Sequence, residues 1–268
     1  MAEKKRLAHC TWKEVEELGP ERTPVLIPVG ATENYGPHLP LGSDHIYAEA
    51  VALAVAERAG GLVAPTLPFG YSHYFHKFPG TITLKPETLK GLVIEVIECL
   101  SGQGFRTFLL VNTHMGNVPT LEHAAREAMD RLPVRVALAD PWRVANVVSA
   151  DLLETEDHPI GHASELGTSV ISHLAPEAVR PDLKTKGTHS QESDEFRRLN
   201  PSRVLFDRVE YLVFGDARKL NPTGVSGDPS LGSKEKGEKI FDLVADHIAR
   251  FFEAWLQVKG AWSSSSGP

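Results

Sequence analysis

Short apolar runs alternate with amphipathic stretches along most of this chain, and this alternation limits the possible folds more than any other feature. The run PVLIPVG at 24–30 has the length and apolarity of a buried strand, and TFLLVNTH at 107–114 has the same character. Longer segments with helix start and stop residues separate such runs. Strands alternating with helices are typical of a largely parallel sheet covered on both faces. We therefore predict one three-layer α/β/α domain over residues 1–262, built on a mostly parallel sheet.

The boundaries of the remaining elements follow from local signals. Helices are expected to begin where Asp or Pro precedes an apolar pattern and to end at glycines. Further strands are predicted at 62–70 and 134–140. Helices are predicted at 44–60, 86–104, 118–132, 163–174 and 234–258. The region 143–190 is otherwise expected to be less regular, 185–235 to be a long polar stretch, and SSSSGP at 263–268 to be a disordered tail.

Composition excludes several classes of function. With 41% hydrophobic and 24% charged residues the chain is typical of a globular protein, and its net charge of −7 argues against nucleic-acid or anionic-lipid partners. No apolar run reaches the ~20 residues of a membrane span, and the first residues lack the apolar core of a signal peptide. We therefore expect a cytoplasmic protein that acts on a small molecule. Two cysteines stand against twelve histidines, so imidazole and carboxylate would hold any metal, which suits zinc, manganese or iron(II).

Two carboxylates flank a loop rich in glycine and proline. Glu33 lies three residues past the strand predicted at 24–30, and Asp44 lies eleven residues later at the start of a predicted helix. A rigid loop could turn both carboxylates toward one point and so form part of a metal site. Alternatively, Glu33 is a solvated loop residue and Asp44 is a helix cap.

Imidazole groups follow at two further points. His114 ends the strand at 107–114, a position that suits a metal ligand or a proton acceptor, although backbone carbonyls could also satisfy its ring. His162 and Glu165 stand three residues apart, so in a helix both would project from one face. Asp157 and His158 lie just before them. A solvated helix start is the alternative interpretation of this group.

Aromatic and histidine side chains also gather in FGYSHYFHKFPGTITL. His73 and His76 belong to this stretch, and Trp142 follows the strand at 134–140. These side chains could wall a pocket. An aromatic edge of the core is at least as good an interpretation for Trp142.

Five ordered motifs in this chain resemble those of the creatininase (creatinine amidohydrolase) family. They are ENYGPHLPL with Asp44, FPGT at 78–81, NTHMGN at 112–117, HASELGTS at 162–169 and GVSGDP at 224–229. The resemblance implies a three-layer α/β/α hydrolase, often hexameric, with a dinuclear zinc or manganese centre that hydrolyses a C–N bond in a small amide.

Position by position, the resemblance assigns roles to individual residues. It implies that Glu33 and His114 hold one metal and that Asp44 bridges two. His162 matches the active-site histidine, a proton shuttle, and Glu165 matches a glutamate that could act in catalysis or bind the second metal. We expect one metal site, with the following residues contacting substrate: Tyr35, His38, His73, His76 and Trp142.

Three positions depart from the family pattern. Tyr35 stands where the second-metal histidine is usual, Gly116 replaces a metal-binding glutamate of creatininase itself, and Gly167 replaces a glutamate before Thr-Ser. A phenol binds metal less readily than imidazole at neutral pH because its pKa is near 10. The second metal site is therefore expected to be weakened or lost.

The leading hypothesis is a metal-dependent hydrolase that cleaves a C–N bond in a small cyclic amide or formamide with metal-activated water. One alternative is a hydrolase that opens a cyclic keto-polyol of the inosose type at a C–C bond, or a lactone. Another is a family member that binds a small ligand without catalysis. Assembly as a homo-oligomer is expected from the resemblance alone.

Overall fold

The computed structural model describes residues 5–258 except 155–160, 188–194, 196 and 201–202, and describes only the backbone of 197–200. The tail predicted at 263–268 lies outside the described residues. None of the described helices combines the length and the apolarity that a membrane crossing requires.

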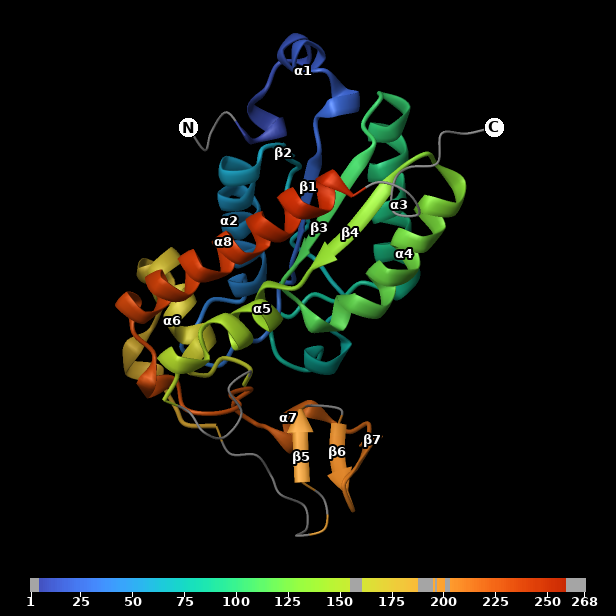
Figure 1. Ribbon diagram of the computed structural model, residues 1–268. Helices are drawn as coiled ribbons and strands as arrows, with labels where there is room; N and C mark the ends of the chain where they lie inside the picture. The colour runs from blue at the N-terminus through green and yellow to red at the C-terminus, as the bar shows by residue number, and fades with distance from the viewer. Residues whose placement is uncertain (1–4, 155–160, 188–194, 196, 201–202, 259–268) are drawn as a thin grey trace.

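A four-stranded parallel sheet forms the centre of the molecule (Figure 1). Its strands are β1 (Val25–Val29), β2 (Leu62–Val63), β3 (Thr107–Asn112) and β4 (Arg135–Ala139), in the spatial order β2-β1-β3-β4. Leu26 of β1 lies opposite Leu109 of β3, and Ile27 lies opposite Leu110. All three strand pairs are parallel, which confirms the predicted sheet type.

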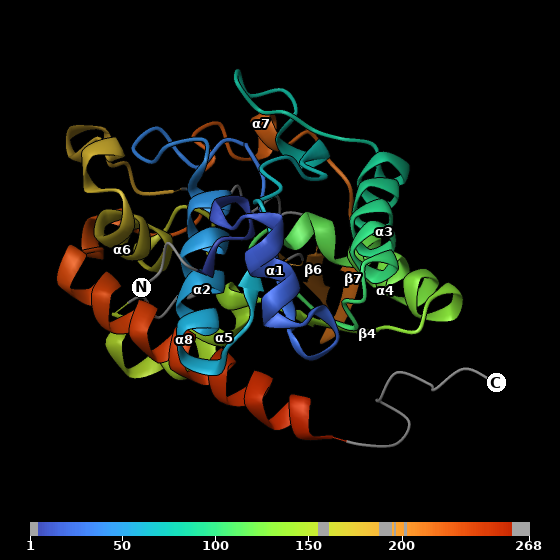
Figure 2. The ribbon, with the colours of Figure 1, turned by 90° about the horizontal axis from the view of Figure 1, so that it is seen from above.

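Helices cover both faces of this sheet (Figure 2). On one side lie α2 (Ser43–Ala59), α5 (Pro141–Val148), α6 (Glu165–Leu174) and α8 (Lys234–Gln257), and on the other lie α3 (Pro86–Gly102) and α4 (Val118–Arg131). Leu26 and Leu109 pack in the first of these cores, whereas Ile27 and Leu110 pack in the second. This alternation follows from the two-residue period of a strand. The α/β/α sandwich is confirmed.

The strand predicted at 62–70 is much shorter than expected. Only β2 pairs along the sheet, and Leu67 adds an isolated bridge to Val29. Pro65 and Pro68 lack the N–H groups that a continued ladder would need, so the pairing is interrupted on both sides of Leu67.

Outside the predicted polar stretch at 185–235, two of the described helices lie where none was predicted. The first, α1 (Trp12–Leu18), begins with a capping box in which Thr11 and Glu14 bond reciprocally. The second, α5, begins at Pro141 after Asp140, whose side chain accepts from the Arg143 N–H. Asp-Pro is a local start signal that could have been read from the sequence.

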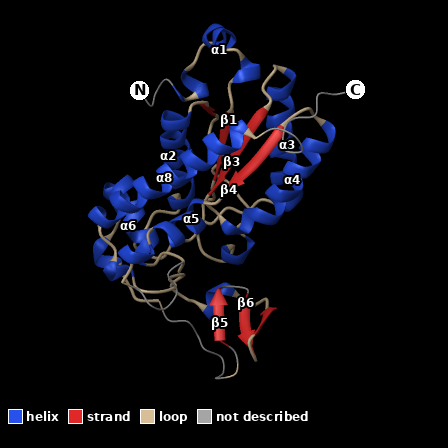
Figure 3. Cartoon of the chain, in the orientation of Figure 1, coloured by secondary structure: helices blue, strands red, loops and turns tan. Residues whose placement is uncertain are grey.

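A second, antiparallel sheet occupies part of the stretch predicted to be polar loop. Its strands are β5 (Arg197–Asn200), β6 (Arg203–Phe206) and β7 (Val209–Leu212), and the short helix α7 (Ala217–Leu220) follows (Figure 3). The β6–β7 turn places Asp207 and Arg208 at positive φ, 44° and 66°. Asn-Gly is the usual signal for such a turn, and its absence hid this hairpin in the sequence.

Short 3₁₀ turns complete the described chain. They are η2 (Leu7–His9), η3 (Pro20–Arg22), η4 (His73–Phe75), η5 (Met115–Asn117), η6 (Ala150–Leu152), η7 (Pro176–Ala178), η8 (Pro181–Leu183) and η9 (Pro229–Leu231). Two of them, η4 and η5, lie close to the chemistry described next.

Candidate metal centre

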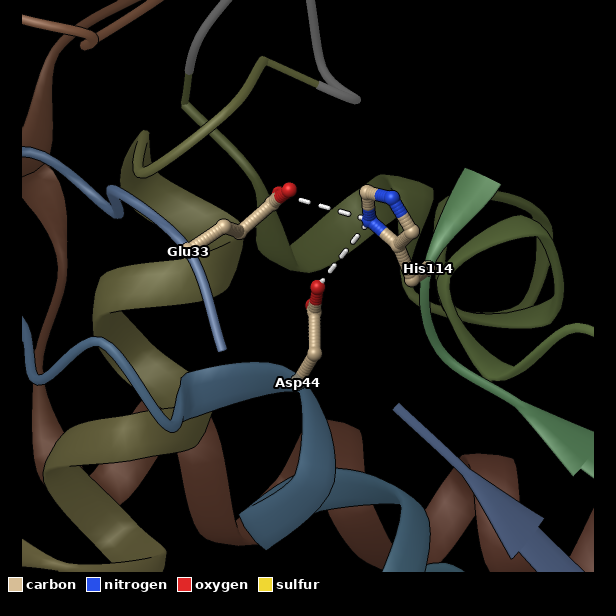
Figure 4. A group of neighbouring side chains, drawn as sticks. All are labelled: Glu33, Asp44 and His114. Atoms are coloured by element: carbon tan, nitrogen blue, oxygen red, sulfur yellow. Dashed lines mark ion pairs between the residues drawn. The ribbon is translucent and has the colours of Figure 1, made fainter. Parts of the chain in front are cut away.

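Three side chains with metal-binding atoms meet beyond the carboxyl ends of neighbouring parallel strands (Figure 4). Glu33 lies in the loop after β1, Asp44 in the first turn of α2, and His114 two residues past β3. Open α/β sheets bind ligands at this edge because the loops after adjacent strands converge there. The structure therefore brings together the three residues predicted to hold the first metal.

The three groups present one nitrogen and two oxygens to a common point. His114 Nδ1 lies 3.3 Å from Glu33 Oε1 and 3.2 Å from Asp44 Oδ2. All three donor atoms lie within 4.8 Å of one another, and all three residues are buried. Among the residues that the structure describes, this is the only such group of three.

Asp44 does not cap its helix. Gly42 occupies the N-cap position of α2, and no side chain caps the helix there. The alternative interpretation of Asp44 as a helix cap is therefore wrong, and its carboxylate is directed to the centre instead. The Thr113 hydroxyl donates to the Asp44 backbone oxygen at 2.7 Å, which ties the start of α2 to the end of β3.

The orientation of the His114 ring is fixed by its other nitrogen. Nε2 lies 2.9 Å from the Tyr71 carbonyl oxygen. A carbonyl only accepts, so Nε2 carries a hydrogen and Nδ1 is the atom turned toward the two carboxylates. Such an outer hydrogen bond is the usual support of a metal-binding histidine. Neither Tyr71 nor Ser72, whose hydroxyl oxygen lies 3.4 Å from His114 Nε2, was predicted from the sequence to support the centre.

The charges of the cluster depend strongly on one another. Burial alone would lower the pKa of His114, but Glu33 and Asp44 raise it well above its ordinary value. Burial raises the pKa of Asp44, and the Glu33 charge adds to the rise. Burial also opposes ionisation of Glu33, yet the His114 charge and the hydrogen bond from His114 hold its pKa below the usual range. The two carboxylates thus favour a positive charge between them.

A divalent cation fits this arrangement. Glu33 Oε2 and Asp44 Oδ2 are buried and have no hydrogen-bond partner among the described residues. Buried acceptors of this kind require an explanation, and a metal ion supplies one. One imidazole and two carboxylates are ligands that zinc, manganese and iron(II) accept.

His162 lies beside this group. Its ring is stacked on Phe75 with centroids 4.4 Å apart, and it packs against Tyr35 at 4.3 Å. Its Nε2 lies 2.6 Å from the Asn34 carbonyl oxygen. Nε2 must therefore donate, which leaves Nδ1 of the neutral ring as the proton acceptor. The charge of His162 also lowers the pKa values of Glu33 and Asp44, as expected for a neighbour of the centre.

Glu165 is not part of the group formed by Glu33, Asp44 and His114. Its carboxylate is buried and forms an ion pair with Lys236 of α8, and it accepts from the Glu154 backbone N–H at 3.0 and 3.1 Å. These contacts tie Glu165 to the start of α6 and to α8, and its role as a metal ligand or a catalytic group stays a prediction. Asp157 and His158 lie outside the described residues.

Loss of Lys236 is expected to destabilise the fold. The Lys236→Met variant would remove the Lys236 cation from the buried Glu165 carboxylate, which costs about 3 kcal/mol in the free energy of unfolding. Denaturant unfolding measures this. The Lys236→Met/Glu165→Gln double variant should recover part of the loss, and Lys77→Met, which breaks the exposed pair with Asp216, should change stability little. Equal losses of unfolding free energy in Lys236→Met and Lys77→Met would contradict the assignment of Glu165 and Lys236 as a stabilising buried pair.

His38 lies in the interior instead of a substrate pocket. It is fully buried, and its Nε2 lies 2.8 Å from the Thr168 hydroxyl. The prediction that His38 contacts substrate is therefore not supported. Burial, together with the charge of Lys184, lowers the pKa of His38 to about 4.

His38 is expected to weaken the fold in acid. The unfolded chain takes up the imidazole proton near pH 6.5, whereas the folded protein does so only near pH 4, so stability falls as the pH drops through this window. The loss should reach about 3 kcal/mol by pH 4. Comparing unfolding free energies at several pH values, the His38→Gln variant should show a flatter dependence than the wild type. Substitution of the exposed His123 should leave the slope unchanged, and identical slopes in all three proteins would refute the prediction.

The other predicted pocket residues divide into two groups. His73 and His76 are exposed and stack on each other with ring centroids 4.5 Å apart. Tyr35 is buried beside the metal group, and Trp142 donates from Nε1 to Asp44 Oδ1 at 3.3 Å. Burial, followed by the charges of Asp44 and Glu33, raises the pKa of the Tyr35 phenol well above its ordinary value. Tyr35 and Trp142 thus contact the centre itself.

Comparison with known proteins agrees with this geometry. The creatininase family model, described as creatinine amidohydrolase, matches residues 8–252. The chain belongs to the creatininase family. It is 30% identical to a creatinine amidohydrolase of Pseudomonas putida over 264 residues, which cover 91% of this chain and 94% of the relative. The solved structure named "Creatininase Mn" matches with a TM-score of 0.80 at 26% identity, covering 95% of this chain and 99% of that one.

Two further relatives are named for other activities. A mycofactocin precursor peptide peptidase of Mycobacterium ulcerans is 32% identical over 237 residues, covering 84% of this chain and 83% of the relative. A 3-dehydro-scyllo-inosose hydrolase of Thermotoga maritima is 36% identical over 253 residues, covering 90% and 80%. Like its relatives in this family, the chain is a hydrolase.

Proposed function

We propose that this protein is a metal-dependent hydrolase that cleaves an amide C–N bond. The buried group of Glu33, Asp44 and His114 carries the proposal, because its orphaned carboxylate oxygens and oriented imidazole suit a divalent cation. Zinc and manganese are the proposed ions, with iron(II) also compatible with these ligands. One solved relative is named for Mn and another is a creatininase variant named as a Zn-Zn type, which supports this choice.

A divalent ion at this site would lower the pKa of a bound water to about 7 and polarise the carbonyl under attack. His162 is proposed to take a proton from the attacking water at Nδ1 and to pass it to the nitrogen that leaves as the C–N bond breaks. The Asn34 carbonyl oxygen supports this role because it holds the proton of Nε2. The three proposed ligands are all present, and the His162 imidazole beside them is held in place. This argues against the alternative of a ligand-binding protein without catalysis.

The relatives favour amides but leave a second substrate class open. Creatinine amidohydrolase and the peptide peptidase are both named for reactions at C–N bonds. The 36% identity to the inosose hydrolase favours a cyclic keto-polyol as the second candidate. Substrate contacts of His73 and His76, the cytoplasmic location and the hexameric assembly stay predictions.

A substrate panel distinguishes these candidates. Metal-loaded protein is incubated with cyclic amides, formamides, short peptides, lactones and inosose-type ketones, and product formation is followed by mass spectrometry. Turnover of an amide class, abolished by chelator and restored by zinc or manganese, is the expected result. Turnover of keto-polyols alone would replace the amidase proposal with the second candidate. Ligand binding with no turnover anywhere in the panel would contradict both.

A further inference from the structure

We infer that the centre holds a single ion and that two residues position Asp44: Trp142, which occupies its second oxygen, and Tyr35, which lies beside the same carboxylate. This inference rests on the proposed metal-dependent function. A carboxylate bridges two ions by offering a different oxygen to each. In this chain the two oxygens of Asp44 have different surroundings, and only one of them faces the other ligands.

Oδ2 of Asp44 faces the centre. It lies 3.2 Å from His114 Nδ1 and has no hydrogen-bond partner among the described residues. Oδ1 instead accepts from the Trp142 indole N–H at 3.3 Å. The Trp142 ring packs on Tyr47 with centroids 4.3 Å apart, and Tyr47 is completely buried. The indole donor is therefore held in place behind the carboxylate.

Tyr35 lies beside the same carboxylate. Its side chain is 5% exposed, and burial, followed by the Asp44 charge, raises the pKa of its phenol. The Tyr35 ring lies between Trp142 and His162, with centroid distances of 6.3 and 4.3 Å. The indole N–H of Trp142 thus occupies Oδ1, the oxygen that a second cation would need, and an N–H donor does not bind a cation.

Two glycines leave room for this arrangement. A Cβ at Gly167 would lie 3.2 Å from Tyr35 Cε1, so the small residue on α6 leaves room for the phenol ring. A Cβ at Gly116 would overlap the Tyr71 carbonyl oxygen and crowd His114 Nε2. A carboxylate at position 116 would therefore disturb the hydrogen bond that orients His114. The Tyr35 ring uses the space that Gly167 leaves, and the Tyr71 carbonyl uses the space that Gly116 leaves. Both pairs favour a single ion.

Donors to the outer oxygen of a ligating carboxylate fix its orientation, and their removal typically weakens metal binding 10- to 100-fold. The Tyr35→Phe and Trp142→Phe variants each remove one donor while keeping a ring in place. Both are expected to bind Zn²⁺ or Co²⁺ about tenfold more weakly than the wild type, with one ion per chain in all three proteins. Tyr211→Phe, on the exposed strand β7, and Trp255→Phe on α8 are the matched controls and should bind as the wild type does.

The measurement is equilibrium dialysis of the metal-free full chain against Zn²⁺ or Co²⁺, with bound metal counted by mass spectrometry. Thermal melting of the metal-free variants shows that each has folded. Two ions of comparable affinity in the wild type, or unchanged affinity in both donor variants, would overturn the inference and leave the proposed function standing. Failure of the wild type to bind any ion would overturn the proposed function itself, and the single-ion inference with it.

Discussion

Replacing His114 with alanine is expected to remove the bound metal and nearly all activity. The substitution deletes one of three ligands and leaves two buried carboxylates facing each other without a cation between them. The ion is expected to supply several kcal/mol of transition-state stabilisation, and ~4 kcal/mol corresponds to roughly a thousandfold in rate. Metal content and turnover on the substrate found in the panel are the two measurements.

The matched control for His114→Ala is His123→Ala, which removes an exposed imidazole on α4, the helix that begins just after His114. It should retain both the metal and the activity. Melting curves of the two variants separate loss of the ion from loss of the fold. A His114→Ala protein that kept a full equivalent of metal would show that the three-residue group is not the binding site.

The residues of the metal group could be predicted because their signals are local. Glu33 and His114 each follow an apolar strand, and Asp44 opens the helix after a loop rich in glycine and proline. Parallel topology then brings these strand ends to one edge. The same reasoning yielded the sheet and its main helices, since each needs only the period of its apolar residues.

The predicted site residues that the structure places away from the three-residue group have partners that are distant in sequence. Glu165 has the spacing of a helical metal ligand, but Lys236 lies 71 positions away and pairs with it. His38 stands beside site residues along the chain, yet it packs on Thr168, 130 positions later. Pairings at such separations depend on how α6 and α8 pack, and no local pattern specifies them. Trp142 illustrates the same limit, since its contact with Asp44 required the position of α5.

These corrections also change the interpretation of the family resemblance. Tyr35, Gly116 and Gly167 are departures when they are considered one at a time. In the fold, Gly167 makes space for the Tyr35 ring, and Gly116 allows the close approach that positions His114. The three departures thus form one consistent arrangement around the proposed ligands Glu33, Asp44 and His114.

Replacing His162 with alanine is expected to leave the metal in place and to lower kcat by roughly 10² to 10⁴, the range for loss of a proton-transfer group. His162 makes no contact within the ligand set, so metal content should stay at the wild-type value. Its Nε2 is held by the Asn34 carbonyl oxygen and its ring lies between Tyr35 and Phe75. A side chain held this firmly offers only Nδ1 to an attacking water.

Addition of free imidazole tests this role directly. The alanine variant leaves a space flanked by Tyr35 and Phe75, and imidazole that enters it should restore part of kcat in proportion to its concentration. The His173→Ala variant, which removes an imidazole that packs against Phe241, should need no rescue. A variant with normal kcat would assign the proton to another group. Loss of kcat that imidazole never restores would indicate that His162 acts by shaping the loop around Ala163, whose backbone has a φ of 53°, and not by carrying a proton.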